Sequence, residues 1–423
     1  MTLSRNVAPR VEELLASFRL VVLAGARQTG KTTLVRELLE LPASSQFTMD
    51  DEAVLRRATD DPAGFVASLP RPAAIDEFQR AGRGLLLAVK RAVDLDTARG
   101  QLLLTGSANY LADRSVSETL AGRAGRLVLW PLSMGERNGV VETFIDHLFE
   151  PADWPPPAST LSRADLVRAL LQGGYPEVVT QRLRARRRRA WFDAYVSDVV
   201  SREALRPIAD VRLEADLRRV LRLLAARTAG ELVIADLARD ADLARETTAT
   251  YVGLLEALYL VVRLPAWATS ATTRAKRRSK ILIVDTGLAA DLCGTGEAEF
   301  GPRADGRQAG ALFETFVLTE VHKQSAWCER SVDLAHFRDR NGAEIDLIVE
   351  DRRTGQFAGI EAKLTSTPTD RDARHLASFR DRFGARFTVG LVIHAGSYTL
   401  PLGDRLWAVP VTALHRHDPL DPA

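Results

Sequence analysis

Near its amino terminus the chain carries a phosphate-binding pattern, G-x-x-x-x-G-K-[ST], spelled by Gly25, Ala26, Arg27, Gln28, Thr29, Gly30, Lys31 and Thr32 and followed by Thr33. The backbone N–H groups of such a loop and of the helix after it can hold nucleotide phosphates. Lys31 would contact the β- and γ-phosphates, and the Thr32 hydroxyl would contact Mg²⁺. An apolar run before the pattern predicts a strand, and residues 33–39 predict a helix, which is the context this motif needs.

A pair of acids, Asp76 and Glu77, ends the short apolar run 72–75. Asp76 would hold Mg²⁺ through the water shell of the ion. Glu77 would orient or deprotonate an attacking water molecule. The run is only weakly apolar, with two alanines where bulky residues are usual. Together with the phosphate loop, the pair predicts ATP and Mg²⁺ as ligands and hydrolysis as the reaction.

A third apolar run, residues 101–104, ends in polar residues that would lie beside the other two sites. Thr105 or Ser107 would contact the γ-phosphate or the water, and a Gly-Ser turn is the alternative interpretation. Arg123 and Arg126 follow in a glycine-punctuated loop. Either arginine could act in trans on the γ-phosphate of a neighbouring subunit, which predicts a homo-oligomer. The alternative is a pair of ordinary surface arginines.

The carboxyl-terminal third contains a second set of candidate residues: Glu314 on an expected helix, Asp346 on an expected strand, and Glu361 and Lys363 on the next strand. Asp346 and Glu361, with Glu314 as an outer ligand, would bind one or two Mg²⁺ ions that polarise a phosphodiester. Lys363 lies two residues after Glu361 and therefore on the same face of the strand. It would position the nucleophile or stabilise negative charge. Glu-x-Lys is also common on exposed strands, so a binding domain without cleavage is the alternative.

The elements that position these residues divide the chain of 423 residues into several predicted domains. A proline-rich stretch at 151–159 marks a hinge. We predict a P-loop core at 1–147, a hinge and helical region at 148–212, a winged helix at 213–292 and a nuclease-like domain at 293–423. The overall class is α/β.

The middle region offers two basic surfaces for DNA. Six arginines lie within residues 182–189, where they could bind phosphates or form a solvated face. Three expected helices and a strand between 214 and 264 have the order of a winged helix-turn-helix. The start of its last helix would contact DNA, and the basic stretch 274–280 would be a phosphate-contacting wing; the candidate residues on that helix are Arg245, Thr247, Thr248 and Thr250.

Several of these segments together resemble a prokaryotic branch of AAA-type ATPases, akin to the archaeal-type ATPases. They are GARQTGKTT, AIDEFQ, LLLTGS, LAGRAGRLVLWPLSMGE and GGYPE. The resemblance implies an ATP-binding α/β core, a helical and winged-helix region and a carboxyl-terminal domain of unknown function. In such ATPases Ser107 or Thr105 would occupy the sensor position, with Asn109 as a further candidate. The set of Glu314, Asp346, Glu361 and Lys363 resembles the PD-(D/E)xK family, whose fold is that of the restriction endonucleases.

The net charge of only +2 gives no global field for nucleic acid. The amino terminus lacks a continuous apolar signal region, and no apolar stretch reaches membrane length. The two cysteines have no metal or redox spacing. These features predict a cytoplasmic protein without membrane contact. We therefore expect an ATP-hydrolysing protein that acts on DNA, or alternatively a nucleotide-dependent protein-interaction switch.

Overall fold

The computed structural model describes residues 3–38, 41–106, 120–150, 159–200, 211–270, 272, 274, 277–339 and 342–415. The chain forms two compact units. We call Thr2–Leu132 with Leu254–Leu260 the N-terminal unit, and Ser133–Gly253 with Val261–Ala423 the C-terminal unit. The predicted hinge at 151–158 lies outside the described residues. The division into four domains stays a prediction.

The N-terminal unit contains a five-stranded sheet with the order β2-β3-β4-β1-β5, and all of its strands are parallel. Its strands are β1 (Leu20–Ala24), β2 (Gln46–Thr48), β3 (Ala73–Asp76), β4 (Leu102–Gly106) and β5 (Ala124–Val128). Its helices are α1 (Ala8–Ser17), α2 (Lys31–Leu38), α3 (Glu52–Asp60), α4 (Pro62–Ser68) and α5 (Gly82–Leu95).

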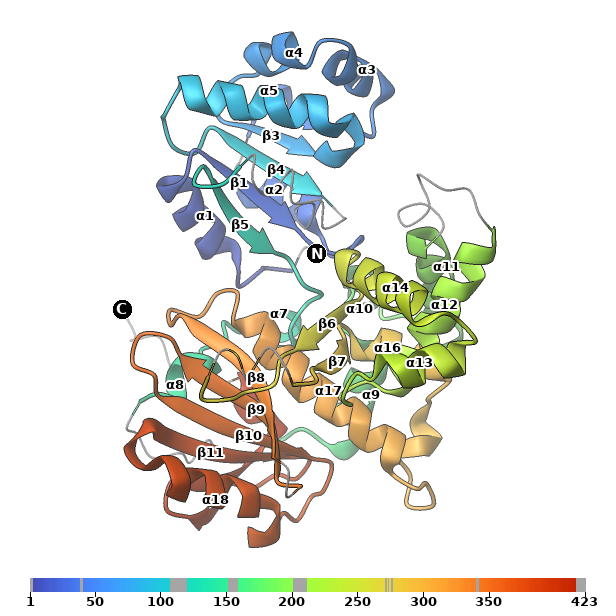
Figure 1. The fold of residues 1–423 in the computed structure, drawn as a ribbon, viewed down its shortest axis with the longest axis vertical. Coiled ribbons are helices and arrows are strands. Elements are labelled where there is room, and N and C mark those ends of the chain that lie inside the picture. Colours follow the sequence, from blue (N-terminus) through green and yellow to red (C-terminus); the bar gives the residue numbers. More distant parts are fainter. Residues whose placement is uncertain are drawn as a thin grey trace. The chain divides into compact units, whose positions relative to one another are not determined.

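One core of this unit lies between the sheet and helices α3, α4 and α5 (Figure 1). Leu20 and Val22 of β1 and Leu102 and Leu104 of β4 all belong to it. These are alternate residues, as expected for one face of a strand, because successive side chains point to opposite faces. The strands are buried on both sides, which is usual for parallel sheets covered by helices. The predicted α/β P-loop core is confirmed.

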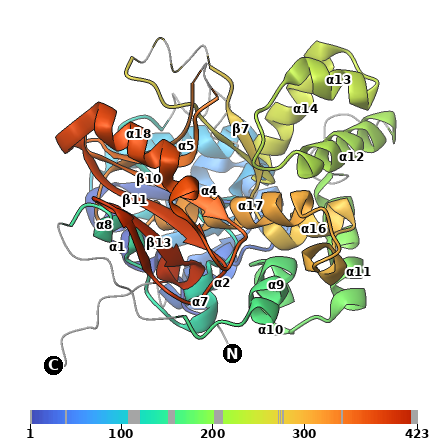
Figure 2. The same cartoon turned by 90° about the horizontal axis from the view of Figure 1, so that it is seen from below.

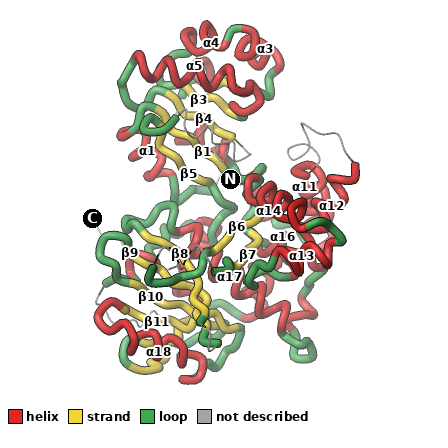
Figure 3. The backbone as a smooth tube through the Cα atoms, in the orientation of Figure 1, coloured by secondary structure: helices red, strands yellow, loops and turns green. Residues whose placement is uncertain are grey.

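The first part of the C-terminal unit is mostly helical. Its helices are α7 (Met134–Asn138), α8 (Phe144–His147), α9 (Arg163–Gln172), α10 (Pro176–Thr180), α11 (Ala185–Asp198), α12 (Val211–Ala226), α13 (Ile234–Ala241), α14 (Arg245–Ala257) and α16 (Thr286–Cys293). The last turn of α14, from Leu254 onward, belongs to the N-terminal unit. Ser162 caps α9 as predicted, by accepting a hydrogen bond from the backbone N–H of Asp165. Strands β6 (Val261–Leu264) and β7 (Lys280–Ile283) follow α12, α13 and α14 as an antiparallel pair (Figure 3).

The second part of this unit is built on a six-stranded mixed sheet with the order β12-β13-β11-β10-β9-β8. Strands β8, β9 and β10 are antiparallel (Figure 1). Strand β11 pairs in parallel with both β10 and β13 (Figure 2). The strands are β8 (Val332–Arg338), β9 (Glu344–Asp351), β10 (Phe357–Lys363), β11 (Phe387–His394), β12 (Leu400–Gly403) and β13 (Leu406–Pro410). Helices α17 (Arg307–Gln324) and α18 (Arg374–Phe383) contact this sheet.

Helix α18 closes a core that is rich in aromatic rings. Phe379 contacts Phe357 and Phe387, with ring centroids 5.2 Å and 6.3 Å apart. Burial of such rings is a large part of the stabilisation of a small domain. Across the described residues, no helix combines the length and the apolar character needed to span a membrane.

Candidate functional site

The phosphate loop connects the carboxyl end of β1 to the amino end of α2. Its backbone takes positive φ at Gly25 (149°), Gln28 (60°) and Gly30 (94°). A Cβ atom on Gly25 would lie only 2.3 Å from the carbonyl oxygen of Leu129, so this position requires glycine. Lys31 Nζ donates to the carbonyl oxygens of Gly25 (2.9 Å) and Ala26 (2.8 Å). Its ammonium group therefore lies against the loop that would hold the phosphates.

Arg5 braces this loop, a role that the sequence did not suggest. Its guanidinium donates to the carbonyl oxygens of Thr29 and Trp130, both at 2.7 Å. The Thr29 hydroxyl donates to the carbonyl oxygen of Ala26 at 2.9 Å. These contacts fix the loop from outside and from within, and a fixed loop loses less entropy when a ligand binds.

Asp76 lies between two threonines at the carboxyl edge of the sheet. The Thr32 hydroxyl donates to Asp76 Oδ2 at 2.7 Å, and the Thr105 hydroxyl donates to Asp76 Oδ1. This edge collects the ends of β1, β3 and β4 because the three strands are parallel. Hydroxyl and carboxylate oxygens are ligands that Mg²⁺ prefers. The Thr32 hydroxyl and the Asp76 carboxylate therefore lie close enough together to contact the same Mg²⁺ ion.

Glu77 follows Asp76 with a left-handed backbone, at φ 53°. This conformation costs a non-glycine residue about 1–2 kcal/mol, and such strain is concentrated at functional sites. Gln79 Nε2 donates to Glu77 Oε2 at 2.5 Å. A Cβ atom on Gly106 would lie 2.6 Å from Gln79 Oε1, so Gln79 also reaches the end of β4. Gln79 was missed as a functional residue, because nothing in the sequence pairs it with Glu77.

The other predicted residues of this site are Ser107, Asn109, Arg123 and Arg126. Ser107 and Asn109 lie outside the described residues. The Arg123 carbonyl accepts a hydrogen bond from the N–H of Leu20, which places it at the amino edge of the sheet. The length of β1, roughly 13 Å at about 3.3 Å per residue, separates this edge from the phosphate loop. Arg123 pairs with Asp94 and lowers its pKa, and Arg126 is exposed on β5.

A second cluster of charged residues lies in the C-terminal unit, where Lys280 of β7 is buried among carboxylates. Lys280 Nζ lies 2.6 Å from Glu314 Oε1, 2.9 Å from Glu344 Oε1 and 3.1 Å from Asp346 Oδ1. Its side chain is only 2% exposed. The structure thus brings Glu314 and Asp346 together as predicted, and adds Lys280 and Glu344, which the sequence interpretation did not include.

Glu361 and Lys363 of β10 complete this lysine–carboxylate cluster. Lys363 Nζ lies 2.9 Å from Glu361 Oε2, and the backbone N–H of Ala362 donates to Asp346 Oδ2 at 2.9 Å. Lys363 and Glu361 therefore share one face of the strand, as their spacing predicted. Their roles in metal binding and cleavage stay predictions.

The pKa values of the cluster follow from burial and from the two lysines. Burial alone would lower the pKa of Lys280, but the carboxylates of Asp346, Glu314 and Glu344 outweigh it and raise the pKa. Burial, and then the charge of Asp346, raise the pKa of Glu314 to about 8. Burial and Asp346 likewise raise the pKa of Glu361 well above its usual value. Protonated carboxyls and lysines thus balance the buried charge.

As they stand, these residues do not fit a divalent metal ion. The ammonium group of Lys280 already lies at hydrogen-bonding distance from Glu314 and Asp346, which were two of the three predicted ligands. A metal ion at the same oxygens would meet an adjacent positive charge at close range, which is strongly unfavourable inside a protein. We therefore derive no cleavage step from this cluster.

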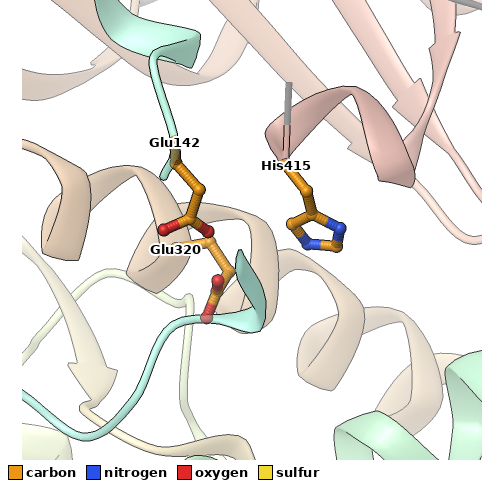
Figure 4. Close-up of side chains that lie close together, drawn as sticks. All are labelled: Glu142, Glu320 and His415. Atoms are coloured by element: carbon orange, nitrogen blue, oxygen red, sulfur yellow. The ribbon is translucent and has the colours of Figure 1, made fainter. Parts of the chain in front are cut away.

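A third group of acids anchors the first turn of α7. The backbone N–H of Met134 donates to Glu320 at 2.7 Å, and that of Gly135 donates to Glu142 at 2.8 Å. Ser133 and Glu136 complete a capping box. Figure 4 shows the Glu142 and Glu320 carboxyl groups together, with the ring of His415 beside them. These acids satisfy the N–H groups that a helix start leaves unpaired.

The predicted DNA surface of the winged-helix region is reduced by the structure. Thr248 was predicted to contact DNA from the start of α14. Its side chain is instead fully buried, so this prediction is wrong. Within the predicted wing, Lys280 is buried in the lysine–carboxylate cluster and Arg274 pairs with Glu350 at 2.6 Å. Lys276 lies outside the described residues. Arg245 and Thr250 are exposed on α14.

Family profiles match three successive parts of the chain. An AAA-domain profile matches residues 17–138, and two domains of unknown function match residues 163–299 (DUF8612) and 309–414 (DUF4143). Together with the phosphate loop and the parallel sheet, these matches define an AAA-type P-loop ATPase core with a carboxyl-terminal domain of unknown function. The matching family has no assigned function, so the nuclease-like character of that domain stays a prediction.

The chain is also similar to two mycobacterial proteins over nearly its whole length. It is 30% identical over 411 residues to the uncharacterized protein Rv2008c of Mycobacterium tuberculosis, covering 96% of this chain and 83% of the relative. The uncharacterized protein Mb2031c of Mycobacterium bovis matches to the same extent. The chain belongs to the family of these proteins.

Among solved structures, the Walker-type ATPase PABY2304 of Pyrococcus abyssi matches 68% of this chain and 95% of its own, with 17% identity and a TM-score of 0.43. The Thermotoga maritima RuvB Holliday junction branch migration motor matches 62% of this chain and 90% of its own, with 17% identity and a TM-score of 0.31.

Proposed function

We propose that this protein binds and hydrolyses ATP at the loop Gly25–Thr32. The observation that carries the proposal is the contact of Thr32 and Thr105 with Asp76 beside Lys31. ATP would draw the Lys31 ammonium from the loop carbonyls onto its phosphates. Mg²⁺ held by Thr32 and Asp76 would neutralise phosphate charge. Glu77, held by Gln79, would orient the attacking water.

The test is ATP turnover by the intact chain and by two variants. Lys31→Ala should abolish ATP binding at this loop. Glu77→Gln should still bind ATP, but its kcat should fall by about 10²–10⁴, the usual contribution of a positioned general base. A Glu77→Gln protein with the turnover of the parent chain would exclude Glu77 from the chemistry.

We further propose that Arg123 acts on the ATP of a neighbouring copy in a homo-oligomer. Arg123 lies at the opposite edge of the sheet from the phosphate loop of the same chain. This separation supports a role at the ATP of another copy and not at its own. Mixing Arg123→Ala with Glu77→Gln would test this, because a mixed oligomer contains sites with an intact Glu77 and an intact neighbouring arginine. Each variant should be inactive alone, and the mixture should regain turnover. Arg126→Ala, three residues further along on β5, is the control. Lack of recovery, with both variants folded, would count against the trans arginine.

DNA is the second candidate partner, supported by the exposed Arg245 on α14 and by the arginines of α11. Fluorescence anisotropy with duplex, forked and junction DNA, with and without ATP, tests this. Binding should weaken steeply with added salt, and Arg245→Ala should weaken it further. No binding at low salt would leave the protein-interaction switch as the better proposal.

We propose that the carboxyl-terminal domain acts as a binding domain and does not cleave DNA. The contact of the Lys280 ammonium with Glu314 and Asp346 supports this. DNA nicking in Mg²⁺ or Mn²⁺ should be equal in the parent chain and in Asp346→Ala. Nicking that disappears with Asp346→Ala would instead establish a nuclease.

A further inference from the structure

The C-terminal unit contains a cavity of about 910 Å³ that the ATPase site does not use. Its walls come from α7, α9, α16 and the start of α11, together with the loop that follows α16. Figure 2 shows α9, α11 and α16 grouped on one side of this unit. Ligand sites of small molecules have volumes of about 300–1,000 Å³. The cavity therefore has the size of a small-molecule site.

Arginines dominate the lining of this cavity. Among the lining residues, two acids, Asp291 and Glu297, stand against six arginines. One of the six, Arg168, also pairs with Asp165 outside the lining, so the arginines still outnumber the acids. Burial lowers the pKa of both Arg137 and Arg188, so their charges are held in a partly desolvated place. A bound anion would relieve this cost. The six arginines are Arg137, Arg168, Arg182, Arg184, Arg188 and Arg189.

Two further features of the cavity favour the binding of an anion. The amino end of α11, a helix of 14 residues, opens at the cavity with Arg184 as its N-cap. Helix amino ends attract anions through their N–H groups and dipole. Arg137 is oriented by a hydrogen bond from Nη2 to Gln172 Oε1 at 2.6 Å. Guanidinium groups bind phosphate oxygens with two parallel hydrogen bonds.

The cavity also has an apolar side, made by Leu171, Val179 and Leu183. We infer that this cavity binds a phosphorylated small molecule with at least two phosphates and a flat ring whose face packs on these apolar side chains, such as a nucleotide, separately from the ATP site. A nucleic acid is less well matched, because its phosphates follow an extended groove. Binding in this cavity is independent of the ATP hydrolysis proposed for the phosphate loop.

The test is isothermal titration of Lys31→Ala protein, whose phosphate loop is disabled, with inorganic pyrophosphate and then with ADP. The double change Arg188→Gln with Arg189→Gln should weaken both affinities at least about tenfold, because charge-assisted hydrogen bonds are lost. The matched control is Arg186→Gln with Arg187→Gln, which makes the same charge change on the same helix but outside the cavity. It should change both affinities less than about twofold.

Three outcomes would overturn the inference: no pyrophosphate binding by the Lys31→Ala protein, equal weakening by the two double variants, or displacement of pyrophosphate only by a DNA strand. Hydrogen exchange on the Lys31→Ala protein keeps the test valid if the arginine variants misfold. Pyrophosphate should slow exchange at the start of α11 and in the loop 294–297. Protection confined to other segments would also overturn it.

Discussion

Asp76 joins three segments that are far apart in the chain, because Thr32 and Thr105 donate to its two carboxylate oxygens. The β3 strand ends at Asp76, while the threonines follow β1 and lie near the end of β4. Asp76 is thereby held in one orientation before any ligand is present. Preorganised carboxylates of this kind lose little entropy on binding.

We predict that Thr105→Val lowers ATP turnover without unfolding the protein. Threonine and valine have nearly the same shape, so the change removes only the hydroxyl donated to Asp76. A hydrogen bond to a charged group contributes about 1.5–3 kcal/mol, which corresponds to roughly a 10- to 100-fold loss if it acts in the transition state. The measurement is kcat as a function of Mg²⁺ concentration.

Thr48→Val is the control for this change. Thr48 ends β2 on the same edge, but its hydroxyl accepts from the backbone N–H of Asp50. The ATP turnover of Thr48→Val should match that of the parent chain. Equal turnover in Thr105→Val and Thr48→Val would show that the Thr105 contact has no role in catalysis.

Sequence patterns indicated which residues lie together at the phosphate loop, and they indicated the C-terminal cluster only in part. Gly25–Thr32, Asp76 and Thr105 could be predicted because motif spacing and parallel strand ends place them together. Lys280 was assigned to an exposed wing, yet it is buried beside Glu314 and Asp346. Its environment depends on the contact of β7 with α17, and no local pattern encodes that tertiary contact.

The lysine–carboxylate cluster gives a second prediction, for Lys280→Met. Removing one partner from a buried ion pair costs about 3–5 kcal/mol, because the remaining charges are left uncompensated. We expect Lys280→Met to melt at a lower temperature than the parent chain. Mn²⁺ should partly restore its melting temperature by binding to the carboxylates that remain.

Lys280→Met combined with Asp346→Asn is the control, and Mn²⁺ should not restore its stability. The parent chain should not gain stability from Mn²⁺ in an Asp346-dependent way. Such a gain would contradict the assignment of Lys280 as the resident cation of the cluster.

At the scale of elements, α7 depends on acids from other segments. It has only five residues, so its own hydrogen bonds stabilise it weakly. Glu142 and Glu320 accept from its first N–H groups, and Glu320 lies on α17. Helix α7 is therefore tied to the long helix of the carboxyl-terminal domain.

This anchor predicts a pH dependence of stability. Burial, and then the charge of Glu320, raise the pKa of Glu142 from 4.5 to about 8. The folded state therefore keeps a proton that the unfolded state loses, and the free energy of unfolding falls as pH rises from 4.5 to about 8. His415 has the opposite effect, because burial lowers its pKa from 6.5 to about 4. The Glu142 effect should therefore be clearest between pH 6.5 and 8.

The glutamine side chain of Glu142→Gln resembles the protonated Glu142 carboxyl group and does not titrate. The variant should therefore lose the part of the pH dependence of the unfolding free energy that Glu142 contributes. Over 1.5 pH units, one proton corresponds to about 2 kcal/mol. The measurement is the difference in unfolding free energy between the parent chain and Glu142→Gln, by urea denaturation at several pH values. Glu320, His415, Ser133, Glu136 and the backbone N–H of Gly135 are among the groups that face Glu142. An identical slope in both proteins would reject the raised pKa of Glu142.

At the scale of the whole molecule, the chain returns once to the N-terminal unit. The segment Leu254–Leu260 belongs to the ATPase unit, whereas Val261 and the residues after it belong to the C-terminal unit. No sequence pattern predicts this return, because the segment is predicted only as the end of one helix and the start of a strand. Tyr259 in this segment packs against Ala24 and Ala26, and Ala26 is part of the phosphate loop.

Tyr259 therefore offers a test of communication between the nucleotide loop and the rest of the chain. It is 6% exposed, and its ring lies 5.8 Å from that of Trp130 at 77°. Tyr259→Ala should destabilise the N-terminal unit by about 3–5 kcal/mol through the cavity that it leaves. Loss of contact with Ala26 should also weaken ATP binding by about 0.5–2 kcal/mol, or roughly 2- to 30-fold.

ATP titration and thermal unfolding of the intact chain measure both effects. Tyr259→Phe keeps the ring and should restore ATP affinity. Tyr398→Ala makes the same truncation at a residue that is 71% exposed, and it should change neither quantity. If Tyr259→Ala lowers stability but binds ATP as the parent chain does, the segment supports the fold alone. If ATP binding weakens in Tyr259→Ala and recovers in Tyr259→Phe, the packing of one ring links the phosphate loop to the residue that precedes β6 by two positions.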